Sequence, residues 1–191
     1  MGDNMIKYNF KKIIFSFLLT SILLLNTMNV YAYSATNYLN VTRYQQAKSN
    51  WCWIAVSQML GKYYGNNVTQ SEIAYQILGN YNNVPGTDSQ VKSAIYYAIG
   101  HKYSISLKNN ALSYDDMQKN ISGYRPIPIK VQWNSGGAHA VIISGYDANH
   151  NVTIVDPYGN SATRSYSYDK LRTGITLASG TGRYILTWEL V

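Results

Sequence analysis

The order of the periodic patterns along this chain constrains its fold more than any other feature. Within residues 33–191, apolar residues recur at helical spacing in the first part, and alternating strand patterns take over in the second part. Helices followed by a run of strands are typical of an α+β domain, because consecutive strands pair with one another. We therefore expect an α+β fold in which N-terminal helices pack against a C-terminal antiparallel sheet.

Cap residues mark the starts of four predicted helices. A capping-box pattern, Thr69 with Glu72, indicates the start of the second of them. The predicted helices, each with its N-cap residues, are Cys52–Tyr64 (Ser49 and Asn50), Ile73–Leu78 (Thr69), Val91–Ile99 (Thr87 or Asp88) and a short helix through Ile121 (Ser113). Cys52 thus falls in the first turn of a helix.

Six segments have strand patterns. They are Tyr103–Leu107, Ile127–Trp133, His139–Tyr146, Val152–Val155, Thr163–Tyr168 and Tyr184–Leu190. The turn-like residues Asp147–Asn151 join the third of these segments to the fourth. We expect those two strands to form an antiparallel hairpin.

The first 32 residues have the pattern of a secretory leader. Three lysines precede an apolar run over residues 13–25, and Val30-Tyr31-Ala32 offers a small-x-small cleavage site. The alternative is a membrane anchor, but thirteen helical residues reach only about 20 Å, short of the roughly 30 Å of a hydrocarbon core. We expect cleavage after Ala32, secretion to the extracellular space, no stable membrane insertion after cleavage, and one domain over residues 33–191.

The charge of the chain argues against one class of function. The formal net charge is +7, of which +2 belongs to the leader, because that segment holds three Lys and one Asp. The remaining +5 is scattered along the sequence and forms no basic stripe, which does not suit nucleic-acid recognition. We expect a monomer that binds no nucleic acid.

Cys52 is the only cysteine of the chain, so it cannot form an internal disulfide. One interpretation is a buried cysteine that behaves as a small apolar residue. The other is chemical. The start of a helix directs free N–H groups and a positive dipole end at Cys52, which favours the nucleophilic thiolate.

A thiolate nucleophile needs a histidine, and three are available. His150 lies in the predicted hairpin turn, and His101 lies in a helix-to-strand connection, where an exposed loop histidine is the ordinary case. His139 differs, because it opens an apolar strand beside Gly136 and Gly137. Their missing side chains would let a substrate backbone approach closely. His139 is therefore the candidate base.

The remaining candidates are a partner for His139 and an oxyanion donor. Asp156 follows the strand Val152–Val155, and the hairpin brings it to the end of the sheet where His139 lies. The alternative is that Asp156 only starts the turn Asp-Pro-Tyr-Gly, and both interpretations can hold together. Gln46 lies six residues before Cys52, where its amide could join the Cys52 backbone N–H in stabilising an oxyanion. Gln45 is its rival.

Residues Gln46–Trp53, QAKSNWCW, resemble the nucleophile segment of papain-like cysteine peptidases in the Gln-to-Cys spacing and in the Trp after the Cys. Gly137–Asp147 and Val155–Gly159 are similar to the histidine and aspartate segments of bacterial branches of that clan. These branches include secreted effector peptidases of plant pathogens and double-glycine leader peptidases. Two segments depart from the plant enzymes. Asp156 stands where those have Asn, and Asn50-Trp51 stand where papain has Gly-Ser, which leaves the subfamily open.

The resemblance implies a papain-like fold and peptide hydrolysis by acyl transfer. Cys52 would be the nucleophile, His139 the base, Asp156 its orienting partner and Gln46 an oxyanion donor. The substrate would be a protein or peptide, and no cofactor or metal would be needed. A lone cysteine with dispersed histidines also lacks the spacing of a structural zinc site.

Two other functions are compatible with an exported chain of this kind. A Cys-His amidase that cleaves peptidoglycan would also be exported and basic, but such amidases usually carry Asp or Gly before the nucleophile and often an added wall-binding domain. A catalytically silent binding module of the same fold is the second, although the intact Gln-Cys-His-Asp set disfavours it.

Only Tyr33–Gln45 separate the predicted cleavage site from the candidate active-site residues. This segment has no helical pattern and is too short to fold into a blocking propeptide. We therefore expect activity without further trimming, and control by oxidation of Cys52.

Overall fold

The structure, a computed structural model, describes residues 33–160 and 163–191. The predicted leader and its cleavage site lie outside these described residues. Among the described residues, no helix is long and apolar enough to cross a membrane.

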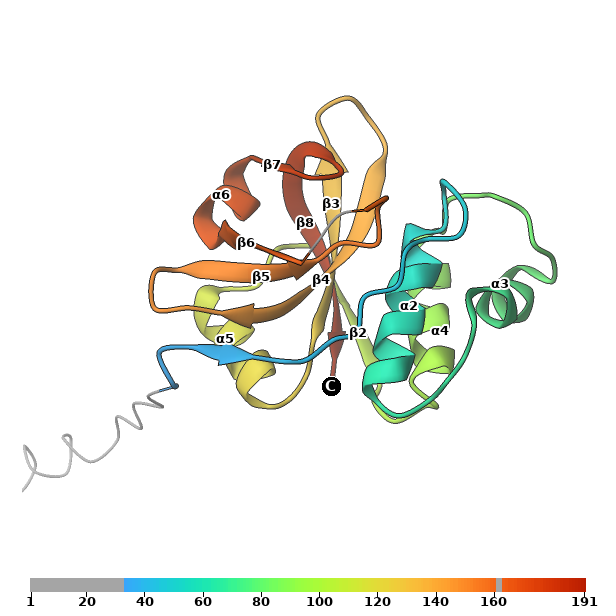
Figure 1. Cartoon of the computed structure of the whole chain (residues 1–191), viewed down its shortest axis with the longest axis horizontal. Helices are drawn as coiled ribbons and strands as arrows, with labels where there is room; N and C mark the ends of the chain where they lie inside the picture. The colour runs from blue at the N-terminus through green and yellow to red at the C-terminus, as the bar shows by residue number, and fades with distance from the viewer. Residues whose placement is uncertain (1–32, 161–162) are drawn as a thin grey trace, which may run out of the picture. The chain divides into compact units, whose positions relative to one another are not determined.

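Figure 1 shows helices α2, α3 and α4 grouped on one side of the described domain and most of the strands on the other. The helices are α2 (Cys52–Tyr63), α3 (Gln70–Leu78), α4 (Asp88–Ala98), α5 (Tyr114–Ser122) and α6 (Tyr168–Thr173). The strands are β1 (Asn37–Tyr38), β2 (Ile105–Lys108), β3 (Ile127–Trp133), β4 (Ala138–Tyr146), β5 (Asn151–Val155), β6 (Arg164–Ser167), β7 (Ile175–Leu177) and β8 (Gly180–Leu190). The predicted α+β class is confirmed.

The described strands form one antiparallel sheet in the order β2-β8-β3-β4-β5-β6, with β1 paired to β4 and β7 paired to β8. The predicted hairpin is present, because β4 and β5 pair with Tyr146 opposite Val152. In its turn the Asp147 carboxylate accepts from the backbone N–H groups of Asn149 and Asn151. The side chain of Asp147 thus fixes the turn, as the sequence indicates.

Helix α2 is buried on nearly all sides. Trp53–Val56, Met59 and Leu60 are all almost inaccessible to solvent. The helix contacts α3 and α4 as well as β4, and a helix that is apolar all round belongs to a core. Core packing therefore fixes the position of Cys52, the first residue of α2.

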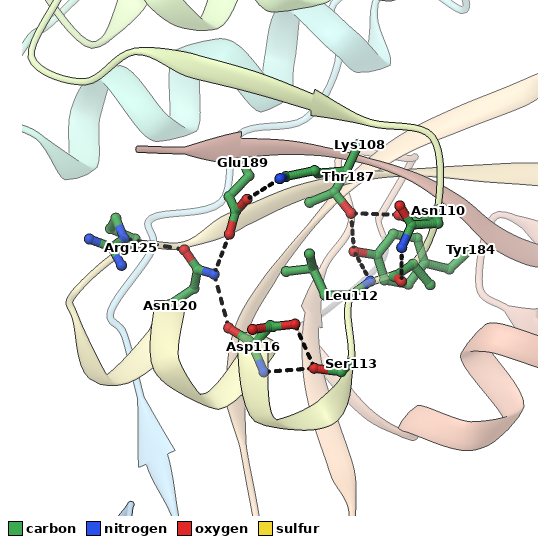
Figure 2. A network of polar contacts seen from close by, with 11 residues as sticks. Lys108, Asn110, Leu112, Ser113, Asp116, Asn120, Arg125, Tyr184, Thr187 and Glu189 are labelled. Atoms are coloured by element: carbon green, nitrogen blue, oxygen red, sulfur yellow. Dashed lines mark hydrogen bonds and ion pairs between the residues drawn. The ribbon is translucent and has the colours of Figure 1, made fainter. Parts of the chain in front are cut away.

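A network of polar side chains joins α5 to two strands of the sheet (Figure 2). Asn120 donates to the Glu189 carboxylate at 2.9 Å and accepts from Arg125. Glu189 in turn lies 3.8 Å from the Lys108 ammonium group on β2. Because Asn120 is buried, these bonds offset the cost of removing its amide from water. The network stabilises the scaffold.

Local signals predicted most helix boundaries within one to three residues. The capping boxes of Thr69 with Glu72 and of Thr87 with Gln90 are both formed, and Ser113 caps α5. The predicted strand Thr163–Tyr168 is shorter in the structure, because the Ser167 side chain caps α6, which then begins at Tyr168. Helix α6 and strands β1 and β7 were not predicted.

Candidate active site

Cys52 is the first residue of α2, and no side chain caps this helix. Ser49 and Asn50 were predicted as its N-caps, and this prediction was wrong, because Trp51 occupies the N-cap position. The Asn50 amide and the Ser49 hydroxyl are instead bonded to Asn83 in the loop between α3 and α4. The first-turn N–H groups therefore face no competing side-chain acceptor and can stabilise negative charge at Cys52.

His139 and Asp156 form a buried pair. His139 Nε2 lies 2.8 Å from Asp156 Oδ1, and the two residues are 6% and 3% exposed. The sequence placed them at the same end of the sheet, and the structure brings them into direct contact. With Nε2 engaged by the carboxylate, Nδ1 is the ring nitrogen that remains for Cys52.

The pKa values of Cys52 and His139 move in opposite directions. Burial raises the pKa of the Cys52 thiol, but a hydrogen bond with His139, its positive charge and the backbone N–H groups of Ala140 and Trp53 together lower the pKa below its ordinary value. Burial lowers the pKa of His139, whereas bonding to Asp156 and Cys52 and their negative charges raise this pKa to about 9. Both shifts favour a thiolate–imidazolium pair over the neutral thiol and imidazole.

Asp156 stays ionised beside this pair. Burial raises the pKa of its carboxyl, but His139, the Ser179 hydroxyl and the Tyr158 backbone N–H lower the pKa below its ordinary value. The carboxylate can therefore accept from His139 and balance its positive charge at neutral pH.

Gln46 and Gln45 differ in where their side chains lie. Gln46 lines the cleft that contains Cys52 and His139, whereas Gln45 is exposed and does not line it. The Gln46 amide nitrogen donates to the carbonyls of Lys48 and Ser49, and its Oε1 atom is buried without a partner among the described residues. Gln46 is thus the better placed of the two, but its amide must release a carbonyl before it can bind an oxyanion.

The cleft has a volume of about 580 Å³. Its walls come from both sides of the described domain, with Trp53 and Gly86 among the helices and Gly137 and Trp188 among the strands. Gly136 and Gly137 have φ angles of 92° and 75°, so the β3–β4 turn requires glycine there for its backbone conformation. The sequence suggested a different reason for these glycines, namely close approach of a substrate backbone. That reason can apply only to Gly137, which lines the cleft.

The other two histidines are exposed and do not line the cleft. His101 stacks on Tyr96, and His150 stacks on Tyr114 with ring centroids 3.8 Å apart. Within residues 33–160 and 163–191, no group of three or more His, Cys, Asp or Glu side chains could hold a metal ion.

The model of the Peptidase_C39 like family matches residues 38–178, which include all four candidate residues. The chain belongs to this family. It is therefore a cysteine-type peptidase, a hydrolase of the papain-like kind. No curated protein matches the chain.

Solved structures of C39-like peptidases share the fold. A C39-like peptidase from Bacillus anthracis is 17% identical, with a TM-score of 0.57, and the match covers 82% of this chain and 98% of that one. The peptidase domain of Streptococcus ComA, a bi-functional ABC transporter involved in quorum sensing, is 14% identical, with a TM-score of 0.57 and coverage of 79% and 98%. A double-glycine-motif protease from an AMS/PCAT transporter, in complex with the leader peptide, is 16% identical, with a TM-score of 0.51 and coverage of 80% and 95%.

Sequence reasoning missed three residues around the candidate catalytic residues of this C39-like peptidase. The Arg43 guanidinium donates to the backbone carbonyls of Asp156, Tyr158 and Gly159. Trp133 stacks on His139, with centroids 5.6 Å apart and an interplanar angle of 21°. Ser179 bonds the Asp156 carboxylate. No local pattern marks these residues, although an aromatic residue just before the Gly136-Gly137 turn was a usable signal for Trp133.

Proposed function

We propose that this chain is a secreted cysteine endopeptidase that hydrolyses peptide bonds through Cys52, His139 and Asp156 by way of a covalent acyl-enzyme. One observation carries the proposal. A buried His139–Asp156 pair faces the chain's only cysteine, at the uncapped start of a helix, inside a cleft. This is the arrangement that nucleophilic catalysis by a thiolate requires.

The chemistry follows from the charges of the three side chains. The Cys52 thiolate attacks the carbonyl carbon of the scissile peptide bond, and the negative charge passes to the carbonyl oxygen. The Cys52 backbone N–H, at the free start of α2, and the Gln46 amide would stabilise this oxyanion. As the C–N bond breaks, the His139 imidazolium gives its proton to the departing amine, which leaves a thioester and a neutral imidazole.

Water completes the reaction. Neutral His139 takes a proton from a water molecule as its oxygen attacks the thioester, and the C–S bond breaks to release the carboxylic acid product. The Cys52 thiolate and the His139 imidazolium are thereby restored. Asp156 keeps the ring oriented in both steps, because its bond to Nε2 directs Nδ1 toward the reacting atoms.

The substrate class is a peptide or an extended protein segment. A cleft open to solvent and shared by helices and strands can receive a chain that passes across it. A structural neighbour holds a leader peptide, which supports a peptide substrate. The leader pattern of residues 1–32 supports secretion, and the scattered charge disfavours a nucleic-acid partner. We further propose that the enzyme is a monomer.

The test compares the parent protein with Cys52→Ala in zymograms of casein and of bacterial cell walls. We expect a casein-clearing band for the parent only, with matching circular dichroism spectra for the two proteins. Clearing of cell walls alone would favour a peptidoglycan amidase. Clearing of casein by Cys52→Ala would show that this thiol is not the nucleophile.

A further inference from the structure

The Asp156 carboxylate is held through both of its oxygens. Oδ1 lies 2.8 Å from His139 Nε2 and accepts from the Tyr158 backbone N–H at 2.9 Å. Oδ2 accepts from the Ser179 hydroxyl at 2.7 Å. Rotation about the Cβ–Cγ bond would move both oxygens, so the bonds to Oδ1 and the bond to Oδ2 oppose this rotation together. The Ser179 hydroxyl supplies the side-chain bond to the second oxygen.

Ser179 lies in a short, well-defined turn. Ala178 and Ser179 form the two-residue connection between β7 and β8, and Leu177 pairs with Gly180 across it. The Thr176 and Thr181 hydroxyls are bonded to each other on the same hairpin at 3.0 Å. Because β8 also pairs with β3, the turn is tied to the centre of the sheet and presents the hydroxyl from a fixed position.

The same hairpin also supports His139, through Trp133. A Cβ atom at Gly182 would approach the Trp133 ring to 2.8 Å, so glycine there leaves room for the indole, and a Cβ atom at Gly180 would lie in ordinary contact with the ring at 3.4 Å. Trp133 in turn stacks on the imidazole of His139. The β7–β8 hairpin therefore reaches His139 through Trp133 and Asp156 through Ser179.

We propose that Ser179 is a positioning residue of the active site, whose hydroxyl orients the Asp156 carboxylate toward His139. This inference rests on the proposed function, because it assumes that His139 acts on Cys52. Ser179 lies one residue beyond the segment that the family model matches, so the family assignment does not cover it.

The proposal makes a directional prediction for the Cys52 thiol. When the hydroxyl is removed, the carboxylate loses its orientation and His139 is held less firmly beside Cys52. The imidazolium then stabilises the thiolate less, so the pKa of the thiol rises. Chemistry should slow while substrate binding stays largely unchanged, because Ser179 acts through Asp156.

The experiment compares Ser179→Val with Ser179→Thr, two variants of nearly equal shape that differ in the hydroxyl. The rate of alkylation of Cys52 by iodoacetamide is measured against pH. This rate reports the thiolate without any substrate, and the chain has only one cysteine to react. The kinetic constants kcat and KM are measured in parallel on a peptide, and thermal unfolding shows whether each variant is folded. Thr176→Ala is the matched control, because it removes a hydroxyl bond from the same hairpin.

For Ser179→Val we expect the alkylation midpoint to move up by roughly half a pH unit, kcat to fall about tenfold and KM to change less than about twofold, as for the loss of a hydrogen bond to a charged group. Ser179→Thr and Thr176→Ala should behave like the parent. An unmoved alkylation midpoint in Ser179→Val, a rise in KM alone, or an equal shift in Thr176→Ala would each overturn the proposal. None of these outcomes bears on the proposed function, which fails instead if Cys52→Ala still hydrolyses casein.

Discussion

The backbone N–H of Gln46 donates to the carbonyl oxygen of Pro157 at 2.9 Å. This bond connects the segment that leads into the nucleophile with the loop that carries Asp156. Arg43 reinforces the connection, because its guanidinium binds three carbonyls of that same loop. The segments that carry Cys52 and Asp156, two of the proposed catalytic residues, are far apart in sequence and are thus joined by one backbone bond and by the Arg43 side chain.

Arg43→Lys should weaken this connection. Lysine keeps the charge but lacks the planar fork that reaches several carbonyls at once. We expect a loss of roughly 1–3 kcal/mol in the free energy of unfolding, together with a several-fold fall in kcat. Urea unfolding and steady-state kinetics measure the two effects. Arg125→Lys, which alters an arginine bonded to Asn120 and absent from the cleft lining, is the control and should leave kcat unchanged.

Gln46→Ala and Gln45→Ala should separate the two candidate oxyanion donors. Removal of a donor that acts only in the transition state lowers kcat by on the order of 10²-fold and leaves KM almost unchanged. We expect this loss for Gln46→Ala and activity close to the parent for Gln45→Ala, because only Gln46 lines the cleft. If Gln46→Ala keeps a kcat equal to that of Gln45→Ala, Gln46 is not an oxyanion donor.

His139→Ala and Asp156→Ala should differ in severity. In the proposed mechanism the histidine transfers protons, whereas the aspartate only orients it and balances its charge. Both variants should lose most of their activity, and Asp156→Ala should retain a measurable fraction that exceeds the activity of His139→Ala. Single-turnover kinetics with enzyme in excess are sensitive enough to rank them. An Asp156→Ala variant as active as the parent would mean that another group orients His139.

The pH dependence of kcat/KM should be bell-shaped. Activity rises with pH as Cys52, whose pKa is lowered, becomes a thiolate, and it falls as His139 loses its proton through a pKa of about 9.

The contribution of His139 to the stability of the fold is complete below its ordinary pKa of 6.5 and is lost as the pH rises through about 9. The contribution of Asp156 to stability has the opposite pH dependence. Its pKa is lowered, so its contribution is complete above 3.8 and is lost at more acidic pH.

Asp156→Asn tests the assignment of the alkaline limb. Without the negative charge of the carboxylate, the pKa of His139 should fall, and the alkaline limb of the profile should move to lower pH. A limb that stays in place in Asp156→Asn would have to be assigned to a group other than His139.

Activity should depend on added reductant and need no proteolytic trimming. Cys52 is partly accessible, has a lowered pKa and lacks a second cysteine that could resolve an oxidised form. Protein that comprises residues 33–191, with its N-terminus checked by mass spectrometry, should be active with dithiothreitol and far less active without it. Protein that stays inactive in reductant until its N-terminus is trimmed would contradict this prediction.

The sequence predicted those parts of the fold that depend on neighbouring residues. Thr69 and Glu72 lie three positions apart and form the capping box that their spacing implies. Ser49 and Asn50 have equally good capping chemistry, yet they bond Asn83, more than thirty positions away. Nothing in a local pattern shows that such a partner will be present, so the prediction of their role failed.

The same distinction holds for the candidate active site. Cys52, His139 and Asp156 could be selected because each lies in a recognisable local context, at a helix start, a strand start and a turn. Arg43 and Ser179 could not, because their roles exist only once Asp156 is beside them, 113 and 23 positions away. A motif search finds groups that do chemistry, whereas supporting groups become visible only with three-dimensional contacts.

Strand β8 lies between β2 and β3, in the interior of the sheet. While the polypeptide is being made, β3, β4 and β5 emerge well before residues 180–190, so the edge of β3 stays open until then. The contacts that the β7–β8 hairpin makes with Trp133 and with Asp156 are also absent until that moment. In a nascent chain the proposed active site therefore stays incompletely supported until β8 has been synthesised. Such late, long-range pairing also slows folding, so proteolytic activity should appear only after synthesis of the whole domain.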